Sequence, residues 1–266
     1  MEPLRPPVPP QTPSFRVMTY NVLNGGRGRE ADVLSVIQSI APDVVVLQEV
    51  FDREFVKGLA DAMNMQWYFA PGNTRWHLAL LSRWPIVAGE SHHPFPPVQQ
   101  TVLEATVEGP LGKHIHVFGM NAGPLPNVLC ELWRRWEVSA ALRRATKYTD
   151  SLCLLVGDFN SVAPGDRPAI ERMRTFDRVL ILLQGNRLFH FAVRSILAAG
   201  MADCFRDLHQ SEDGFTVPVP APNVRLDYVF ANAPMRATLK RCFVVREPVA
   251  VRRASDHYPV VADFTL

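Results

Sequence analysis

Short apolar runs of about strand length recur along the chain, and several consecutive runs have no helical segment between them. The runs that predict strands are residues 15–22, 43–48, 78–83, 102–108, 114–120, 152–157, 225–231, 239–246 and 260–265. The run from Val44 to Leu47 is apolar on both faces, which is typical of a central strand. Because strands predominate over the helices that could connect them, the pattern favours an α/β (α+β) fold with mixed sheets over a purely parallel sheet.

Five further segments have the period of about 3.6 residues that predicts amphipathic helices. They are residues 31–40, 51–63, 127–148, 168–183 and 188–199. In the long helix 127–148 the period places Leu132, Trp136 and Leu142 on the buried side. The same helix carries a basic face formed by Arg134, Arg135, Arg143, Arg144 and Lys147. Such a face is typical of solvated surface, with contact to a phosphate backbone as the alternative.

The organisation of the chain predicts one domain behind a tail. The proline-rich segment 1–14 is predicted to be an extended, mobile tail, and residues 15–266, which contain no repeat and no long linker, are predicted to form one domain. The first fifteen residues hold six prolines and no apolar core of a signal peptide. No run approaches the roughly 18 consecutive apolar residues of a membrane span. These features predict a cytoplasmic protein without stable membrane insertion.

Charge and cysteine content narrow the possible functions. The 28 basic and 26 acidic residues give a formal net charge of +2, which is too small to indicate a nucleic-acid-binding protein by itself. A local basic groove remains compatible with this balance. The four cysteines, Cys130, Cys153, Cys204 and Cys242, form no CxxC pair and no cluster with histidine, which argues against a zinc site.

Polar side chains that can bind a hard cation stand at the ends of the predicted strands. They are Asn21, Glu49, Asp158, Asn160, Asp227, Asp256 and His257. Each one alone is more typical of a turn or a helix cap. If these strands end at the same edge of a sheet, all of these side chains lie together. Such a cluster of carboxylates and carboxamides selects Mg²⁺, Mn²⁺ or Ca²⁺ over zinc. With a histidine beside it, the set suits the activation of water against a phosphate.

Six short motifs follow one another in a fixed order over nearly the whole chain. They are Thr19-Tyr-Asn21, Leu47-Gln-Glu49, Leu81-Ser-Arg83, Gly157-Asp-Phe-Asn160, Arg225-Leu-Asp-Tyr228 and Ser255-Asp-His257. This ordered set resembles the endonuclease/exonuclease/phosphatase superfamily, which includes deoxyribonuclease I-like nucleases, abasic-site endonucleases, neutral sphingomyelinases and inositol polyphosphate phosphatases. The resemblance covers residues 15–266. It implies a four-layer sandwich of two packed mixed β-sheets flanked by helices, with the site at one edge.

The resemblance also implies a metal site for Mg²⁺ or Mn²⁺. Glu49 is expected to be the principal metal ligand, and Asn21 is expected to lie beside it. Asp256 is expected to complete or support the same site. The metal would neutralise the charge that grows on the phosphate oxygens during the reaction.

The remaining motif residues match positions that act on the substrate in the family. Asp158 and Asn160 are expected to position the attacking water and a phosphate oxygen. His257 is expected to stabilise the transition state or to move a proton. Asp227 is expected to hold the His257 imidazole in the useful tautomer.

One position departs from the pattern of many family members. They carry a histidine at the end of the strand before the long helix, whereas this chain has Asn121, followed by Ala122 and Gly123. The abasic-site endonucleases of the family have a similar Asn-Ala-Gly stretch, so Asn121 is retained as a candidate catalytic residue. An asparagine can donate a hydrogen bond to a phosphate oxygen but cannot act as an acid near neutral pH. The alternative is a simple turn at the end of the strand.

Three hypotheses for the function remain. The first is a nuclease-like phosphodiester hydrolase, favoured by the Asn121–Gly123 stretch and the basic helix. The second is a lipid or small-molecule phosphoesterase, because residues 47–52 and 82–86 are similar to sphingomyelinase segments, although the sequence has no long apolar insertion. The third is an inactive family member that binds phosphorylated partners, which Asn121 supports and the retained carboxylates oppose. The sequence identifies a phosphate ester, possibly nucleic acid, as the substrate, and it identifies no partner protein.

Overall fold

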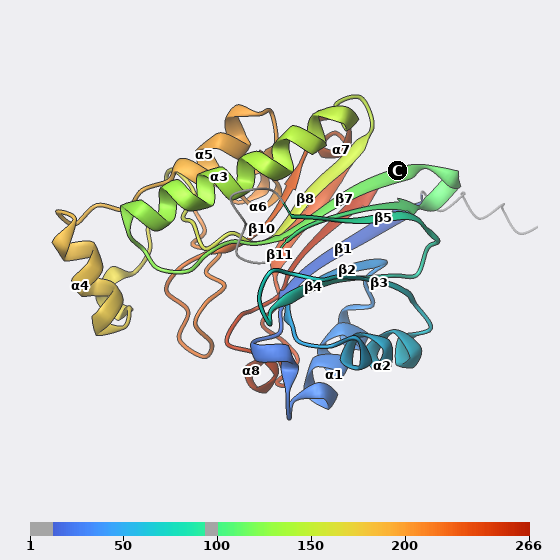
Figure 1. The fold of residues 1–266 in the computed structure, drawn as a ribbon, viewed down its shortest axis with the longest axis horizontal. Helices are drawn as coiled ribbons and strands as arrows, with labels where there is room; N and C mark the ends of the chain where they lie inside the picture. Colours follow the sequence, from blue (N-terminus) through green and yellow to red (C-terminus); the bar gives the residue numbers. More distant parts are fainter. Residues whose placement is uncertain (1–12, 94–100) are drawn as a thin grey trace, which may run out of the picture.

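The apolar runs form two six-stranded sheets that pack face to face, with helices on both outer sides (Figure 1). The computed structural model describes residues 13–93 and 101–266. The arrangement confirms the predicted four-layer sandwich of two mixed sheets flanked by helices. The predicted tail, residues 1–14, lies outside the described residues except for Pro13 and Ser14, and Ser14 already begins the first strand.

The first sheet contains both ends of the described chain. Its strands, in order across the sheet, are β11 (Leu239–Val244), β12 (Val260–Thr265), β1 (Ser14–Asn21), β2 (Val44–Val50), β4 (His77–Ser82) and β3 (Gln66–Ala70). β1 and β2 are parallel, and the other neighbouring pairs are antiparallel. The carboxyl ends of β1 and β2 therefore lie side by side, with Asn21 opposite Gln48.

The second sheet repeats this arrangement around its own parallel pair. Its strands, in order, are β5 (Ile86–His92), β6 (Val102–Glu108), β7 (His114–Asn121), β8 (Leu152–Asp158), β10 (Asp227–Ala231) and β9 (Ala202–Asp203). β7 and β8 are parallel, and the other pairs are antiparallel. The register places Asp158 between Asn121 on one side and Asp227 on the other.

Alternating side chains of the central strands explain why their sequences are continuously apolar. In β2, Val44 and Val46 lie in the core between the sheets, while Val45 and Leu47 pack in the core beneath the helices. β8 alternates in the same way between the inner core and the helices of the second sheet. Burying such a side chain stabilises the fold by about 1.5–3 kcal/mol, so strands with two buried faces hold the sandwich together.

Helices cover both outer faces. The helices are α1 (Glu30–Ile40), α2 (Arg53–Met63) and α8 (Val251–Ala254) on the first sheet, α3 (Val128–Ala145) and α5 (Phe191–Ala198) on the second, and α4 (Thr175–Leu183), α6 (Cys204–Leu208) and α7 (Ala233–Arg236) in the connections. Single 3₁₀ turns are η1 (Asn24–Gly26), η2 (Pro110–Gly112), η3 (Thr146–Tyr148) and η4 (Ile170–Arg172). Among the described residues, no helix has the length and apolar character needed to cross a membrane.

The long helix α3 buries the predicted face only in part, because Leu142 packs against the core beneath the helices whereas Leu132 does not. Its length agrees with the prediction, and Asn127 caps it by accepting a hydrogen bond from the backbone of Cys130. However, Leu132 is 47% exposed, and Arg134, which was predicted to belong to a solvated basic face, is buried. The buried side consists of Glu131, Arg134, Glu137, Val138, Ala140, Ala141 and Ala145. Three of these are charged, so apolar periodicity alone could not identify this face.

Other differences concern segments whose partners are distant in sequence. Residues 168–183 were predicted as one helix, but only η4 and α4 are helical. The backbone of Ala169 donates to Asn223, whose side chain donates back to the carbonyl of Arg172, so this segment is held to the loop before β10. The edge strands β3 and β5 were not predicted, because β3 has only five residues and most side chains of β5 are exposed.

Candidate active site

Two strand ends, one from each sheet, meet at the edge where the predicted site residues converge. Asn21 ends β1 in the first sheet, and Asp158 ends β8 in the second. The side-chain nitrogen Nδ2 of Asn21 donates to Oδ2 of Asp158 across 3.1 Å and to Oε1 of Glu49 across 3.1 Å. One amide group therefore joins a carboxylate of each sheet.

Glu49 projects from an irregular point of β2. The pairing of β2 with β4 shifts between Leu47 and Val50, and Glu49 has a φ of 60° in the left-handed region. For a residue other than glycine this conformation costs on the order of 1–3 kcal/mol, and such strain concentrates at functional sites. The bulge turns the carboxylate out of the strand ladder, where Oε2 accepts a hydrogen bond from the backbone of Asn24 across 2.9 Å.

Asp158 is almost completely buried beside a second carboxylate. Burial, and then the negative charge of Asp227, raise the pKa of Asp158 above its ordinary value. The backbone of Asn160 donates to Oδ1 of Asp158 across 3.0 Å, and its side chain donates to Oδ2 across 3.2 Å. The Asn160 amide also donates to the carbonyl of Ala122 across 2.9 Å, which fixes its orientation.

His257 lies between the two buried carboxylates. Its Nδ1 is 2.9 Å from Oδ2 of Asp227, and its Nε2 is 3.9 Å from Oδ2 of Asp158. Burial by itself lowers the pKa of His257, but the charges of Asp227 and Asp158 outweigh burial and raise this pKa. The two negative charges therefore favour the protonated imidazole, with Nδ1 directed at Asp227 and Nε2 directed toward Asp158.

The segment before β12 places His257 and Asp256 at the site. The hydroxyl of Ser255 donates to the carbonyl of Asn21 across 2.6 Å and accepts from the backbone of His257 across 3.2 Å. Oδ1 of Asp256 and Oδ1 of Asp227 are buried with no hydrogen-bond partner among the described residues. A buried carboxylate oxygen without a partner is energetically costly, and a bound cation would supply the missing partner.

The donor set fits a hard divalent cation. Glu49 and Asp256 supply carboxylate oxygens, and Asp158, Asp227 and His257 present ligand atoms within 4.8 Å of one another. Oxygen-rich sites of this kind suit Mg²⁺ or Mn²⁺. Asn21 directs its amide nitrogen, not its carbonyl oxygen, at Glu49 and Asp158, so direct ligation by Asn21 would require its amide to rotate.

A cavity of about 520 Å³ opens over the cluster. Six of the eight predicted site residues line it: Glu49, Asn121, Asp158, Asn160, Asp256 and His257. Asn21 and Asp227 lie behind them, in contact with Glu49 and His257 respectively. All the predicted residues are therefore brought together. The lining of the same cavity also includes an apolar part, with Leu125, Phe176 and Phe189.

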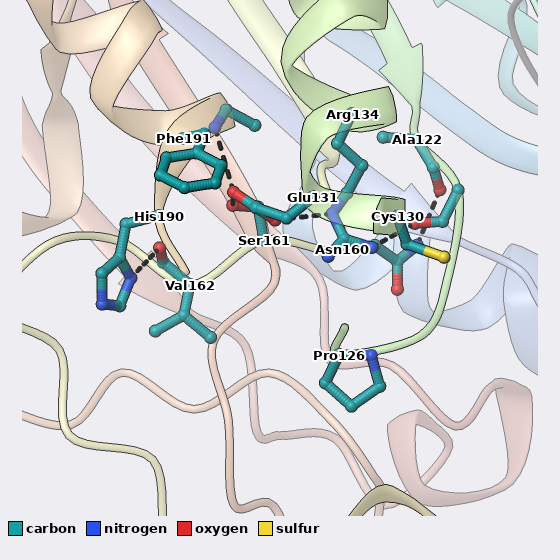
Figure 2. A network of polar contacts seen from close by, with 12 residues as sticks. Ala122, Pro126, Cys130, Glu131, Arg134, Asn160, Ser161, Val162, His190 and Phe191 are labelled. Atoms are coloured by element: carbon teal, nitrogen blue, oxygen red, sulfur yellow. Dashed lines mark hydrogen bonds and ion pairs between the residues drawn. The ribbon is translucent and has the colours of Figure 1, made fainter. Parts of the chain in front are cut away.

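A buried ion-pair network, which apolar periodicity did not predict, supports the apolar part of the cavity lining. Glu131 accepts from Nε of Arg134 across 2.8 Å and from the hydroxyl of Ser161 across 2.7 Å (Figure 2). Arg134 also donates to the carbonyls of Gly123 and Leu125 across 2.7 and 2.9 Å. This network fixes the chain that leaves Asn121. The spacing of Glu131 and Arg134, one helical turn apart, was the available signal.

Arginines and aromatic rings stand at the rim beside Glu49. The guanidinium of Arg75 lies 4.7 Å from the Trp76 ring and 5.4 Å from the Phe51 ring, and Arg27 lies 4.9 Å from the same Phe51 ring. Trp76 lines the cavity, and its Nε1 is 3.4 Å from Oδ1 of Asn24. The rim thus offers stacking surfaces and positive charge next to the carboxylates.

A second group of potential ligand atoms lies on the edge strand β5 and its neighbour β6 in the second sheet. Glu90, His92 and Glu104 approach one another within 4.8 Å. Arg144 donates to both carboxylates, and His92 lies 2.7 Å from Oε2 of Glu104. An internal cation, the Arg144 guanidinium, therefore already neutralises this group, so it does not resemble the cluster around Asp158.

Comparison with known proteins agrees with the fold and the order of the motifs. The model of the Endonuclease/Exonuclease/phosphatase family matches residues 18–257. No curated protein matches the chain significantly.

Several solved structures share the fold at low sequence identity. An AP endonuclease from Archaeoglobus fulgidus is 19% identical with a TM-score of 0.74, and the match covers 95% of this chain and 100% of that one. The 3′ phosphatase NExo from Neisseria, bound to a product DNA hairpin, is 23% identical with a TM-score of 0.74 and the same coverage. TDP2 from D. rerio, complexed with a single-strand DNA product, is 17% identical with a TM-score of 0.67, covering 95% and 99%.

Proposed function

Because the chain belongs to the Endonuclease/Exonuclease/phosphatase family of metal-dependent phosphoesterases, we propose that it hydrolyses phosphodiester bonds at the site between Glu49 and His257. The observation that carries the proposal is the chain of contacts from Glu49 through Asn21 and Asp158 to His257, of which Glu49, Asp158 and His257 line one cavity. We propose a nuclease-like substrate as the first choice.

The proposed metal site consists of Glu49 and Asp256, with Asn21 beside it, donating hydrogen bonds to Glu49 and Asp158. A bound Mg²⁺ or Mn²⁺ ion would supply charge neutralisation at the phosphate oxygens and would lower the pKa of a coordinated water. The buried, unpartnered Oδ1 of Asp256 supports its assignment as a ligand. The strained backbone of Glu49 supports the same role, because the strain turns its carboxylate toward the cavity.

The proposed catalytic steps belong to four side chains of this protein. Asp158, whose raised pKa brings it closer to neutral pH, orients the attacking water and accepts its proton, while the fixed amide of Asn160 helps to orient it. His257, held as a cation by Asp227, stabilises the negative charge that develops on the phosphoryl oxygens. Asn121 lines the same cavity and donates a hydrogen bond to a phosphate oxygen.

The rim beside Glu49 supports a nucleic-acid substrate. Stacked bases are held by aromatic rings and arginine planes, and phosphates are held by exposed arginines. Trp76 and Phe51 with Arg75 and Arg27 provide both kinds of contact beside the cavity. The structures of similar fold that hold DNA products agree with this choice of substrate class.

A second candidate is a lipid phosphodiester, which the apolar part of the cavity lining supports. Leu125, Phe176 and Phe189 line the same cavity as the polar cluster. An apolar lining of this kind suits a substrate with an apolar group next to the phosphate more than a bare phosphomonoester.

The test is a substrate panel with Mg²⁺ or Mn²⁺: supercoiled plasmid, a single-stranded oligonucleotide, bis-p-nitrophenyl phosphate, p-nitrophenyl phosphate and a sphingomyelin dispersion. We expect diester cleavage that EDTA and Glu49→Gln abolish, with Glu54→Gln, an exposed acid of α2, as the matched control. Cleavage of nucleic acid supports the first candidate, and cleavage of lipid with intact plasmid supports the second. If no substrate is cleaved and calorimetry detects no metal binding, the chain is an inactive member and the proposal is wrong.

A further inference from the structure

Exposed apolar side chains are concentrated on one part of the surface. Among residues 13–93 and 101–266, thirteen large apolar side chains are exposed, and eight of them belong to two short segments. These eight form what we call the α3–α4 apolar surface: Leu125, Leu129, Leu132, Trp133, Phe176, Val179, Leu182 and Leu183. Leu129 and Leu183 are 74% and 78% exposed. Soluble domains rarely leave such a group in water without a partner.

The two segments are joined by direct hydrogen bonds. Oε1 of Gln184, directly after α4, accepts from the backbone of Val128 across 3.1 Å, and its Nε2 donates to the carbonyl of Pro126 across 2.8 Å. Figure 1 shows α4 at the end of the molecule, beyond the first turn of α3. Phe176, Val179 and Leu182 follow one another at three-residue spacing, which places them along one side of α4.

Positive charge surrounds the apolar side chains of α4. Residues 167–187 contain five arginines and two acidic residues: Arg167, Arg172, Arg174, Arg178 and Arg187 against Glu171 and Asp177. All five arginines are exposed. The protein as a whole has a formal net charge of only +2, so this basic character is a local property of the segment.

We propose that the α3–α4 apolar surface docks the protein on an anionic lipid surface. Leucine and phenylalanine side chains enter the boundary between head groups and acyl chains, while flanking arginines contact anionic head groups. A nucleic acid would satisfy the arginines but would leave the leucines in water. A second copy of the chain, paired by two-fold symmetry through the same face, would set arginines against arginines. Of these three occupants, an anionic lipid surface alone complements both features.

The docking surface is continuous with the mouth of the active-site cavity. Leu125 and Phe176 belong to the α3–α4 apolar surface and also line the cavity. A docked protein would therefore open its cavity toward the lipid head groups. This consequence rests on the proposed function and selects its second candidate, a lipid phosphodiester, whereas the docking itself does not depend on catalysis.

The test separates docking from catalysis by measuring binding in EDTA. The full chain is mixed with vesicles of phosphatidylcholine alone or with added phosphatidylglycerol, and co-sedimentation and tryptophan emission are recorded. We expect binding to the anionic vesicles with a blue shift, because Trp133 lies in the docking surface. Leu182→Asp/Leu183→Asp should reduce the partition coefficient by at least about tenfold, while Leu208→Asp, at an exposed leucine of α6, should not.

Three results would overturn the inference. The first is no co-sedimentation with anionic vesicles. The second is binding that salt abolishes and that the leucine variant leaves unchanged, which would make the contact purely electrostatic. The third is a dimer, detected by light scattering, that only the leucine variant dissociates, because a second copy would then cover this surface. If the Glu49→Gln protein still binds vesicles but cleaves no substrate, the result supports docking independently of catalysis. The proposed function is then tested by the substrate panel.

Discussion

Nδ1 of His257 lies 2.9 Å from Oδ2 of Asp227, and both side chains are buried. The pair joins residues of different elements, because Asp227 begins β10 and His257 precedes β12. A carboxylate in this position orients the imidazole ring and favours its protonated form. His257 lines the cavity and Asp227 does not, so we expect the two residues to act as one unit in which Asp227 works through His257.

The first prediction concerns this unit. We expect His257→Ala and Asp227→Asn each to lower kcat on a diester substrate by at least about two orders of magnitude, the lower range for a positioned acid–base group. Because both variants disable the same unit, the double variant should lose little more than the more severe single one. The measurement is steady-state kinetics at saturating metal, with circular dichroism to verify folding.

The matched control is His209→Ala, whose ring lies beside Glu212 and the carbonyl of Cys242, on a different element from the site. Its kcat should be unchanged. Fully additive losses in the double variant would mean that His257 and Asp227 act independently.

The second prediction concerns the carboxylates at the cavity. A divalent cation that binds only the folded state stabilises it, by about 2.7 kcal/mol at a hundred times the dissociation constant. We therefore expect Mg²⁺ or Mn²⁺ to raise Tm, and EDTA to reverse the effect. In Glu49→Gln and in Asp256→Asn the rise should be smaller, because each variant removes one proposed ligand charge. The measurement is Tm against metal concentration by calorimetry.

The exposed acid Asp61 provides the comparison for this experiment, since it pairs only with Lys57 on the surface of α2. Asp61→Asn should keep the full metal-dependent rise in Tm. If Glu49→Gln also kept the full rise in Tm, the result would indicate that the metal binds instead to the group formed by Asp158, Asp227 and His257.

The convergence of the site was predictable because of strand geometry. Asn21, Asp158 and Asp227 stand at ends of apolar runs, and parallel or adjacent strands bring such ends to one edge of a sheet. The resemblance of ordered motifs then identified the family, which the family match confirms. The roles given to the individual residues remain predictions.

Other features depend on tertiary contacts that periodicity does not encode. Arginine is usually a surface residue, yet Arg134 is buried. Its guanidinium pairs with Glu131 and donates hydrogen bonds to two backbone carbonyls. The left-handed backbone of Glu49 accompanies a bulge in β2, and no residue in that segment, such as a glycine, predicts the bulge from the sequence. Leu182 belongs to an apolar pattern that predicts burial, yet its side chain is exposed.

The third prediction concerns the glycine before Asp158. Gly157 has a φ of 148°, and a Cβ added there would lie 2.0 Å from the carbonyl oxygen of Met120 in the parallel strand β7. Backbone atoms of a central strand cannot yield by that amount. We expect Gly157→Ala to lower the free energy of unfolding by on the order of 3 kcal/mol or more, as measured by urea denaturation.

A second glycine serves as the control for this substitution. Gly58 lies inside α2, and no atom lies within 4 Å of an added Cβ. Gly58→Ala should stabilise the protein by about 0.5–1 kcal/mol, because glycine is a poor helix former. If both substitutions changed the free energy of unfolding equally, the close approach of residue 157 to Met120 would not be the cause of the loss.

The fourth prediction concerns the ion pair beneath the cavity wall. Arg134→Met leaves Glu131 buried without its cation, and it removes two hydrogen bonds to the chain after Asn121. We expect a loss of about 3–5 kcal/mol of unfolding free energy and, in protein that still folds, a KM raised more than kcat is lowered. The double variant Glu131→Met/Arg134→Met should be more stable than Arg134→Met, because no unpaired charge remains. Lys57→Ala, which breaks an exposed pair on α2, should change stability little. A double variant less stable than Arg134→Met would contradict the claim that the cost comes from the unpaired Glu131.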